Sequence, residues 1–253
     1  MLRFNWAERT QGKRWMKKII FIFPIAAILL FLYLKEFLPG TYEDMIQEDA
    51  VLEYLQAVSY LLASIVALVS AVRFGRRGFV GNKILYFLLF AGLLFIFFEE
   101  ISWGQRIFHI GTPQFFQEHN IQNEISLHNL APIQRRLIKL YILVGLFGSG
   151  AWFLLQKLEV GTRSFIRIIV PDWFISSYFY AVFCVYAYFE YMSNYVVKVL
   201  GMQVSRLDFI FYGRDQEPAE FLMALGFLLF TLVNCRRSKQ IGSAGGSALP
   251  PKG

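Results

Sequence analysis

Cysteine and charge are both scarce in this chain. Its 253 residues include two cysteines and 17% charged residues, while 56% are hydrophobic. Cys184 and Cys235 lie in or beside apolar runs, so we expect no disulfide framework. The apolar share is larger than one soluble domain of ordinary composition can bury, and it also excludes a disordered chain or a small secreted protein. The composition therefore predicts a protein of the lipid bilayer.

Motifs of several enzyme classes are missing as well. The chain contains no GxxxxGK[ST], no GxSxG and no GxGxxG after a strand, so nucleotide hydrolysis, serine-hydrolase chemistry and dinucleotide binding have no support. Ionisable residues do not follow one another across the middle of the apolar runs, which argues against an ion or proton conduit. Polar residues are instead concentrated at one end of these runs.

Six apolar stretches approach the roughly 20 residues that cross a bilayer. The predicted fold class is all-α, a polytopic integral membrane protein with about six transmembrane helices in a compact bundle. The predicted spans are residues 19–38, 50–72, 84–102, 137–156, 168–191 and 218–235. No small-residue cleavage site follows the first stretch, so we interpret it as a retained helix and not a signal peptide.

The spans divide the chain into three predicted regions. Residues 1–18 are a basic cytoplasmic or interfacial segment, and residues 19–235 are the transmembrane domain, with a folded outer loop at 103–136. Residues 236–253 are rich in Gly, Ser and Pro and are expected to be a disordered cytoplasmic tail.

Basic residues predict the orientation. On the side that holds both termini we count 17 of the 25 Lys and Arg residues, so both termini should be cytoplasmic and the membrane is expected to be a bacterial inner membrane. This placement explains the net charge of +7 without a nucleic-acid partner. All acidic residues except Glu8, Glu159 and Asp172 fall on the other side. Acidic residues hardly influence insertion, so their asymmetry needs a separate cause.

Several glutamates lie near the outer ends of the predicted spans. If the inner interface is near Lys83, Glu99 lies sixteen residues further on, about 24 Å along a helix axis and short of the far edge of about 30 Å of hydrocarbon. Glu220 reaches a similar depth when counted back from Arg236. Carboxylates there cost a few kcal/mol unless protonated, paired, metal-bound or facing water. The predicted catalytic residues are Glu53, Glu99, Glu100, Glu217 and Glu220.

A short internal similarity relates two of these glutamates. Residues 53–62 align without gaps on residues 220–229, which pairs Glu53 with Glu220. Membrane proteins built from internal repeats place their sites where the repeats meet. We therefore expect the two acidic helix starts to lie in related positions, with chance similarity between apolar helices as the alternative.

Arg106 and Trp103 follow Glu99 at helical spacing, which predicts that they share its helix face. There Arg106 could neutralise a carboxylate or hold an anionic headgroup. The alternative is a snorkelling arginine beside an interfacial tryptophan. The predicted substrate-binding residues are Trp103, Arg106, Asn129 and Arg214.

All three histidines lie in the outer loop after the third span. Within this loop, Thr112 and Pro113 predict the start of a short helix that reaches His119, with Thr112 as its cap. Imidazoles and a carboxylate can hold a catalytic zinc-like divalent metal, so the predicted ligands are His109, His119, Glu124 and His128. Their spacing matches no recognised metal motif. Hydrogen bonds to loop carbonyls, without any ligand role, are the alternative.

Two acid pairs, Glu43-Asp44 and Glu48-Asp49, occupy the short first outer loop. Their placement resembles that in membrane glycosyltransferases that take lipid-linked sugars, which implies a lipid-linked substrate. Seven-helix membrane hydrolases of the alkaline ceramidase type also surround zinc with histidines and an acid. They carry a histidine pair one turn apart inside the spans, and this chain has none. Neither family is assigned.

Two functions remain after these exclusions. The first is a membrane enzyme with an outward-facing Glu/His site at the bilayer surface, acting on a lipid or lipid-linked substrate by hydrolysis or group transfer. The second is a non-catalytic membrane subunit or scaffold whose acidic outer face docks a partner protein. Partly submerged carboxylates favour the enzyme, because docking works better with acids that are fully in water.

Overall fold

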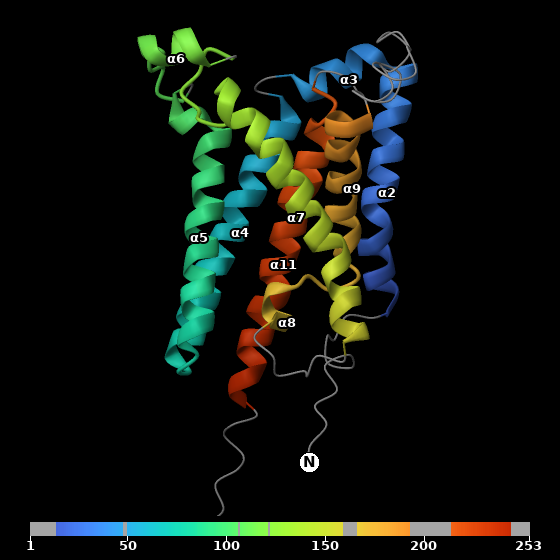
Figure 1. Ribbon diagram of the computed structural model, residues 1–253, viewed down its shortest axis with the longest axis vertical. Helices are drawn as coiled ribbons and strands as arrows, with labels where there is room; N and C mark the ends of the chain where they lie inside the picture. The colour runs from blue at the N-terminus through green and yellow to red at the C-terminus, as the bar shows by residue number, and fades with distance from the viewer. Residues whose placement is uncertain are drawn as a thin grey trace, which may run out of the picture.

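The computed structural model describes residues 14–47, 50–105, 107–120, 122–158, 166–192 and 214–243. These residues are almost entirely helical and contain no strand (Figure 1). The elements are α2 (Arg14–Phe37), α3 (Pro39–Ile46), α4 (Val51–Arg76), α5 (Val80–Glu100), η1 (Ser102–Gly104), α6 (Gln114–His119), α7 (Ala131–Lys157), α8 (Ile166–Ile169), α9 (Ser176–Ala187), η2 (Tyr188–Met192) and α11 (Glu217–Ser243). Of the predicted basic segment 1–18 and the predicted tail 236–253, residues 1–13 and 244–253 lie outside this part of the chain. Residues 14–18 belong to α2, and residues 236–243 belong to α11 and are helical.

Five helical segments among the described residues are long and apolar enough to cross a membrane. They are α2, the α3–α4 segment, α5, α7 from Pro132 and α11 up to Lys239. All-α architecture is therefore confirmed, and five of the predicted spans have counterparts.

The fifth predicted span, residues 168–191, is not one continuous helix. It is divided into the single turn α8, a non-helical segment at Val170–Ile175, the twelve-residue α9 and the π-helical turn η2. Pro171 explains the break, because its ring removes a backbone donor and cannot continue α8. Ser176 Oγ then donates to the carbonyl of Trp173 at 2.6 Å, where α9 begins.

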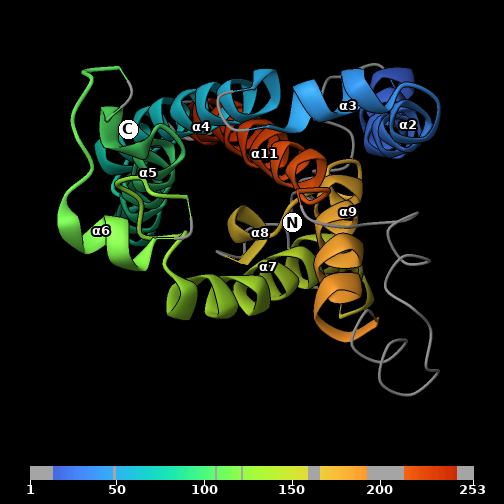
Figure 2. The same ribbon diagram turned by 90° about the horizontal axis from the view of Figure 1, so that it is seen from above.

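The helices contact one another in the order α5, α4, α11, α9 and α7. Seen from above, α4 and α11 lie on one side and α7 on the other, while α5 and α9 close the two ends (Figure 2). A face of small side chains on α4 is fully buried in the core, as the spacing of Ala63 and Ala67 requires. The aromatic pair Phe179–Phe227 joins α9 to α11 with ring centroids 5.4 Å apart.

Glycines bring α7 and α9 into close contact. A Cβ atom on Gly145 would lie 2.7 Å from the backbone nitrogen of Phe183, and one on Gly148 would lie 2.3 Å from Cγ of Phe179. Side chains larger than hydrogen cannot fit at these distances. This close packing sets the position of Tyr141, one turn before Gly145 on the same face of α7.

The loops that carry most polar residues lie at one end of the bundle. Figure 1 shows α3 and α6 at this end, with α8 near the opposite end. Lys35 on α2 donates to Asp215 Oδ2 at 2.5 Å, and Tyr42 on α3 donates to Oδ1 at 2.7 Å. These bonds join α2 and α3 to the segment that begins α11, at the end where the candidate site lies.

Candidate active site

The site begins where α5 ends. The sequence predicted that the helix would continue through Trp103 and Arg106, but α5 stops at Glu100. Ser102, Trp103 and Gly104 then have φ values of 48°, 54° and 78°, a left-handed turn that reverses the chain. The prediction that Trp103 shares a helix face with Glu99 is therefore wrong. Arg106 lies outside the described residues.

The left-handed turn directs Trp103 back onto Glu99. Trp103 Nε1 donates to Glu99 Oε1 at 2.7 Å, and its ring stacks on Phe98 with centroids 5.4 Å apart. Trp103 thus orients a carboxylate, and its polar atom is already used within the protein.

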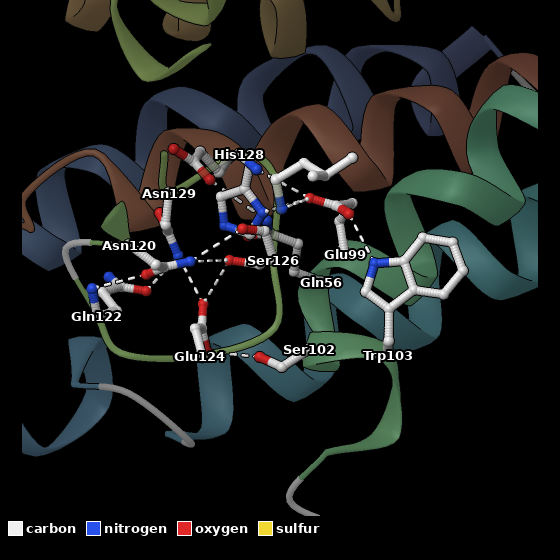
Figure 3. Close-up of polar contacts among 12 residues, drawn as sticks. Gln56, Glu99, Ser102, Trp103, Asn120, Gln122, Glu124, Ser126, His128 and Asn129 are labelled. Carbon is white, nitrogen blue, oxygen red and sulfur yellow. Dashed lines mark hydrogen bonds and ion pairs between the residues drawn. The ribbon is translucent and has the colours of Figure 1, made fainter. Parts of the chain in front are cut away.

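Glu99 also holds the loop that precedes α7, which we call the histidine loop (residues 122–130). Glu99 Oε2 accepts hydrogen bonds from the backbone N–H groups of Leu127 at 2.7 Å and His128 at 2.9 Å. The same oxygen lies 3.2 Å from Nδ1 of His128 (Figure 3). The side chain of Glu99 is buried, so these contacts form largely away from bulk water.

The surroundings of His128 favour the protonated form of its imidazole. Burial alone would lower the pKa of its imidazole, but the hydrogen bond to Glu99 and the negative charges of Glu100, Glu220 and Glu99 outweigh burial and raise the pKa to about 9. Two of these charges come from α5 and one from α11. The pKa of His128 therefore depends on carboxylates from two helices.

Four glutamates form what we call the carboxylate cluster: Glu53 on α4, Glu100 on α5, and Glu217 and Glu220 on α11. Glu100 lies within electrostatic range of Glu53, Glu220 and His128. Glu217 lies within electrostatic range of the other three glutamates and of Arg214. The consecutive helices α4 and α5 and the distant α11 thus place their carboxylates together beside one imidazole.

A small pocket gives access to the carboxylate cluster. It is lined by two members of that cluster, Glu53 and Glu100. Tyr54, Ala57, Ile101, Ser102 and Ile107 form the rest of its wall. The pocket lies between the start of α4 and the end of α5, which are neighbours in the bundle.

Three further residues at Glu220 were not predicted from the sequence. Tyr186 donates to Glu220 Oε1, and Gln56 Nε2 donates to Oε2 at 3.4 Å. Tyr141 stacks on Tyr186 with ring centroids 4.4 Å apart. Gln56 carries a recognisable signal, because it is an amide inside an apolar run one turn after Glu53. Nothing in the sequence marks Tyr186 or Tyr141, since their position depends on the packing of α7, α9 and α11.

The predicted metal ligands do not form a common site. His109 is exposed, while His119 Nδ1 lies 2.9 Å from the carbonyl of Phe115 and its ring stacks on that residue. Glu124 accepts hydrogen bonds from loop side chains. No three His, Cys, Asp or Glu side chains in the described ranges are placed to hold a metal ion. We therefore assign no metal ligand among them.

Two other predicted substrate-binding residues contact protein groups. Asn129 is buried and its Nδ2 donates to Glu124 Oε1 at 2.6 Å. Arg214 lies beside the side-chain amide of Gln122 and within electrostatic range of Glu217. Both residues therefore contact other side chains of the site.

Comparison of the chain with protein-family models, with curated proteins and with solved structures finds no match. Its function is therefore inferred from the geometry of the site.

Proposed function

We propose that this chain is a membrane-embedded enzyme that acts on a lipid or lipid-linked substrate by hydrolysis or group transfer. One observation carries the proposal: His128 is fixed by Glu99 beside carboxylates from α4, α5 and α11. An imidazole and several carboxyl groups that are enclosed together at the end of apolar helices are typical of general acid–base sites.

His128 suits the general acid. An imidazole with a pKa of about 9 is protonated at neutral pH and can give its proton to a leaving oxygen or nitrogen. Glu99 holds Nδ1, which leaves Nε2 as the atom that can donate to a substrate. Glu100 lines the pocket, where its carboxyl group can exchange a proton with a water or hydroxyl group of the substrate. Tyr186 and Gln56 hold Glu220 next to this pair.

The position of the pocket favours a substrate with an apolar tail. The pocket lies beside α4 and α5, whose outward faces carry exposed apolar side chains such as Val58, Leu62 and Phe95. A tail against these faces remains in hydrocarbon while the polar group reaches Glu53 and Glu100. A water-soluble metabolite without an apolar tail would gain nothing from contact with these apolar faces.

The proposal includes the membrane setting. We infer a sixth membrane-crossing segment made of α8, α9 and η2, both termini in the cytoplasm, and a bacterial inner membrane, as the basic residues suggest. Cysteine labelling tests the orientation, with Cys184 and Cys235 first replaced by serine. An impermeant maleimide should label Met45→Cys on intact cells and Phe79→Cys only after permeabilisation. If Phe79→Cys is labelled on intact cells and Met45→Cys is not, the orientation of the protein is the opposite of the one proposed.

Lipid analysis tests the activity. In cells that lack their own copy of the protein, wild type, Glu100→Gln, Glu220→Gln and His128→Gln are expressed at matched membrane abundance, and total lipids are compared by mass spectrometry. The wild type should change the amount of at least one lipid or lipid-linked species, and the three variants should not. Glu118→Gln, an exposed acid on α6, serves as the matched control and should act as wild type. Lipid profiles that do not differ between wild type and the three variants would refute the enzyme.

An acidic docking face has less support from the structure than an enclosed site. Docking requires carboxylates in water, whereas Glu99 and Asp215 are buried and bonded within the chain. A negative lipid experiment would favour the alternative function, a non-catalytic scaffold that docks a partner protein.

A further inference from the structure

We propose that Glu124 is a positioning residue of this site, whose carboxylate fastens the histidine loop to the end of α5 and so places His128 against Glu99. For its catalytic meaning this inference rests on the proposed function. Its structural content stands on contacts that can be tested without any knowledge of the substrate.

The carboxylate of Glu124 joins two separate segments. Oε2 accepts a hydrogen bond from Ser102 Oγ at 2.5 Å, at the end of α5. Oε1 accepts from Ser126 Oγ at 3.0 Å and from Asn129 Nδ2 at 2.6 Å, within the histidine loop (Figure 3). Ser126 and Asn129 lie on either side of His128 in the sequence, so Glu124 holds the loop both before and after the imidazole.

Regular secondary structure does not hold this loop in place. Between α6 and α7 the described residues form only an isolated bridge from Asn120 to Leu130. The loop is shaped by side-chain contacts: Asn120 Nδ2 donates to the Ser126 carbonyl at 2.9 Å, and Gln105 Oε1 accepts from the Ile125 N–H at 2.6 Å. No backbone ladder can replace these bonds, so they hold the loop together with the bonds that Leu127 and His128 make to Glu99.

A carboxylate suits this position because it only accepts hydrogen bonds. Ser102 and Ser126 are at most 2% exposed, so loss of the Glu124 carboxylate would leave their buried hydroxyl groups without this acceptor. The geometry therefore gives Glu124 a different task from the one that the sequence predicted.

The titration of His128 provides the test. The protein has three histidines, and ¹⁵N-labelled imidazole signals of the full chain in detergent can be assigned with His→Gln variants. The groups that set the pKa of His128 are Glu99 and Glu100 on α5 and Glu220 on α11. Glu124→Ala should release the loop from them, so the pKa of His128 should fall from about 9 towards 6.5.

Glutamine should rescue the position. In Glu124→Gln the amide oxygen can accept from Ser126 and Asn129, and the amide nitrogen can donate to Ser102 Oγ, which accepts as well as donates. We expect the pKa of His128 to remain near 9 in this variant. Glu118→Gln, an exposed acid on α6, is the control and should leave His128 unchanged. If Glu124→Ala does not fold, Ser102→Ala removes the contact with α5 alone and should also lower the pKa.

Two results would overturn the inference: an unchanged His128 pKa in both Glu124→Ala and Ser102→Ala, or an equal fall in Glu124→Gln and Glu124→Ala. The lipid experiment fails independently of these results. If Glu124→Ala lowers the pKa but the wild type changes no lipid, the proposed function is wrong and the positioning contact stands. If the wild type changes a lipid but Glu124→Ala leaves the pKa of His128 unchanged, only the positioning role of Glu124 is refuted and the proposed function stands.

Discussion

Nδ1 of His128 lies 3.2 Å from Oε2 of Glu99, and the same oxygen accepts the backbone N–H of His128 at 2.9 Å. One carboxylate oxygen thus contacts the ring and the main chain of a single residue. This double contact fixes both the loop and the imidazole relative to α5. A histidine on a loop gains the rigidity that an acid–base residue needs.

Removal of the Glu99 charge should change the proton affinity of His128. In Glu99→Gln the imidazole loses a charged acceptor, so its pKa should fall from about 9 by about 1 to 2 pH units. Imidazole NMR measures the change. Asp44→Asn, an exposed acid on α3, should leave the pKa as it is. A pKa that stays near 9 in Glu99→Gln would show that Glu99 does not stabilise the imidazolium.

Stability should decrease at alkaline pH because of His128. Its pKa is about 9 in the folded protein and about 6.5 in an unfolded chain, so the folded state binds the extra proton between these values. This contribution, on the order of 1–3 kcal/mol, is fully present below about pH 6.5 and is lost as the pH rises through about 9. The difference in Tm between wild type and His128→Gln should therefore shrink over this range. A constant difference would contradict the raised pKa.

The contact between α7 and α9 should not tolerate a methyl group. In Gly145→Ala the new Cβ meets the backbone nitrogen of Phe183 at 2.7 Å, and backbone cannot rotate away. We expect a loss of about 1–3 kcal/mol, measured as a lower Tm in detergent. Gly150→Ala is the matched control on the same helix, since no atom lies within 4 Å of its added Cβ. Equal Tm values for the two variants would show that the helices do not touch here.

Lys35 should stabilise the end of the bundle that holds the site. Its ammonium group is the charged partner of the buried carboxylate of Asp215, at 2.5 Å. Lys35→Met removes this partner, and we expect a loss of about 2–4 kcal/mol. Adding Asp215→Asn should recover part of the lost Tm, because the buried charge is then gone too. Lys157→Met, at an exposed position of α7, should cost little. A Tm of Lys35→Met equal to that of Lys157→Met would argue against the ion pair.

Apolar length was enough to predict most of the fold. The cores of α2, α4, α5, α7 and α11 lie within the predicted spans, since a stretch of about 20 apolar residues has few alternatives to a helix in lipid. The division of the fifth span at Val170–Ile175 was missed, although Pro171 was a visible signal. The glycines of α7 permit a close helix contact, but nothing in the sequence indicates that α9 is the partner.

The site was harder to predict because it depends on the loop. Counting along the helices placed Glu99 and Glu220 at similar depths, and both act on His128 in the structure. The selection of His128 from three histidines required the fold of the loop. The left-handed turn at Ser102 and Trp103 follows no local preference, because residues with a Cβ rarely adopt positive φ. Gly104 was its only local signal.

The central claim is that a loop histidine and carboxylates from α5 and α11 share one site. The most direct measurement is the pKa of His128 in Glu100→Gln and in Glu220→Gln, each compared with Glu43→Gln. Both site variants remove a negative charge that favours the imidazolium, so we predict a pKa below that of the wild type in each, with no change in the control. A His128 pKa that does not respond to either glutamate would contradict the shared site.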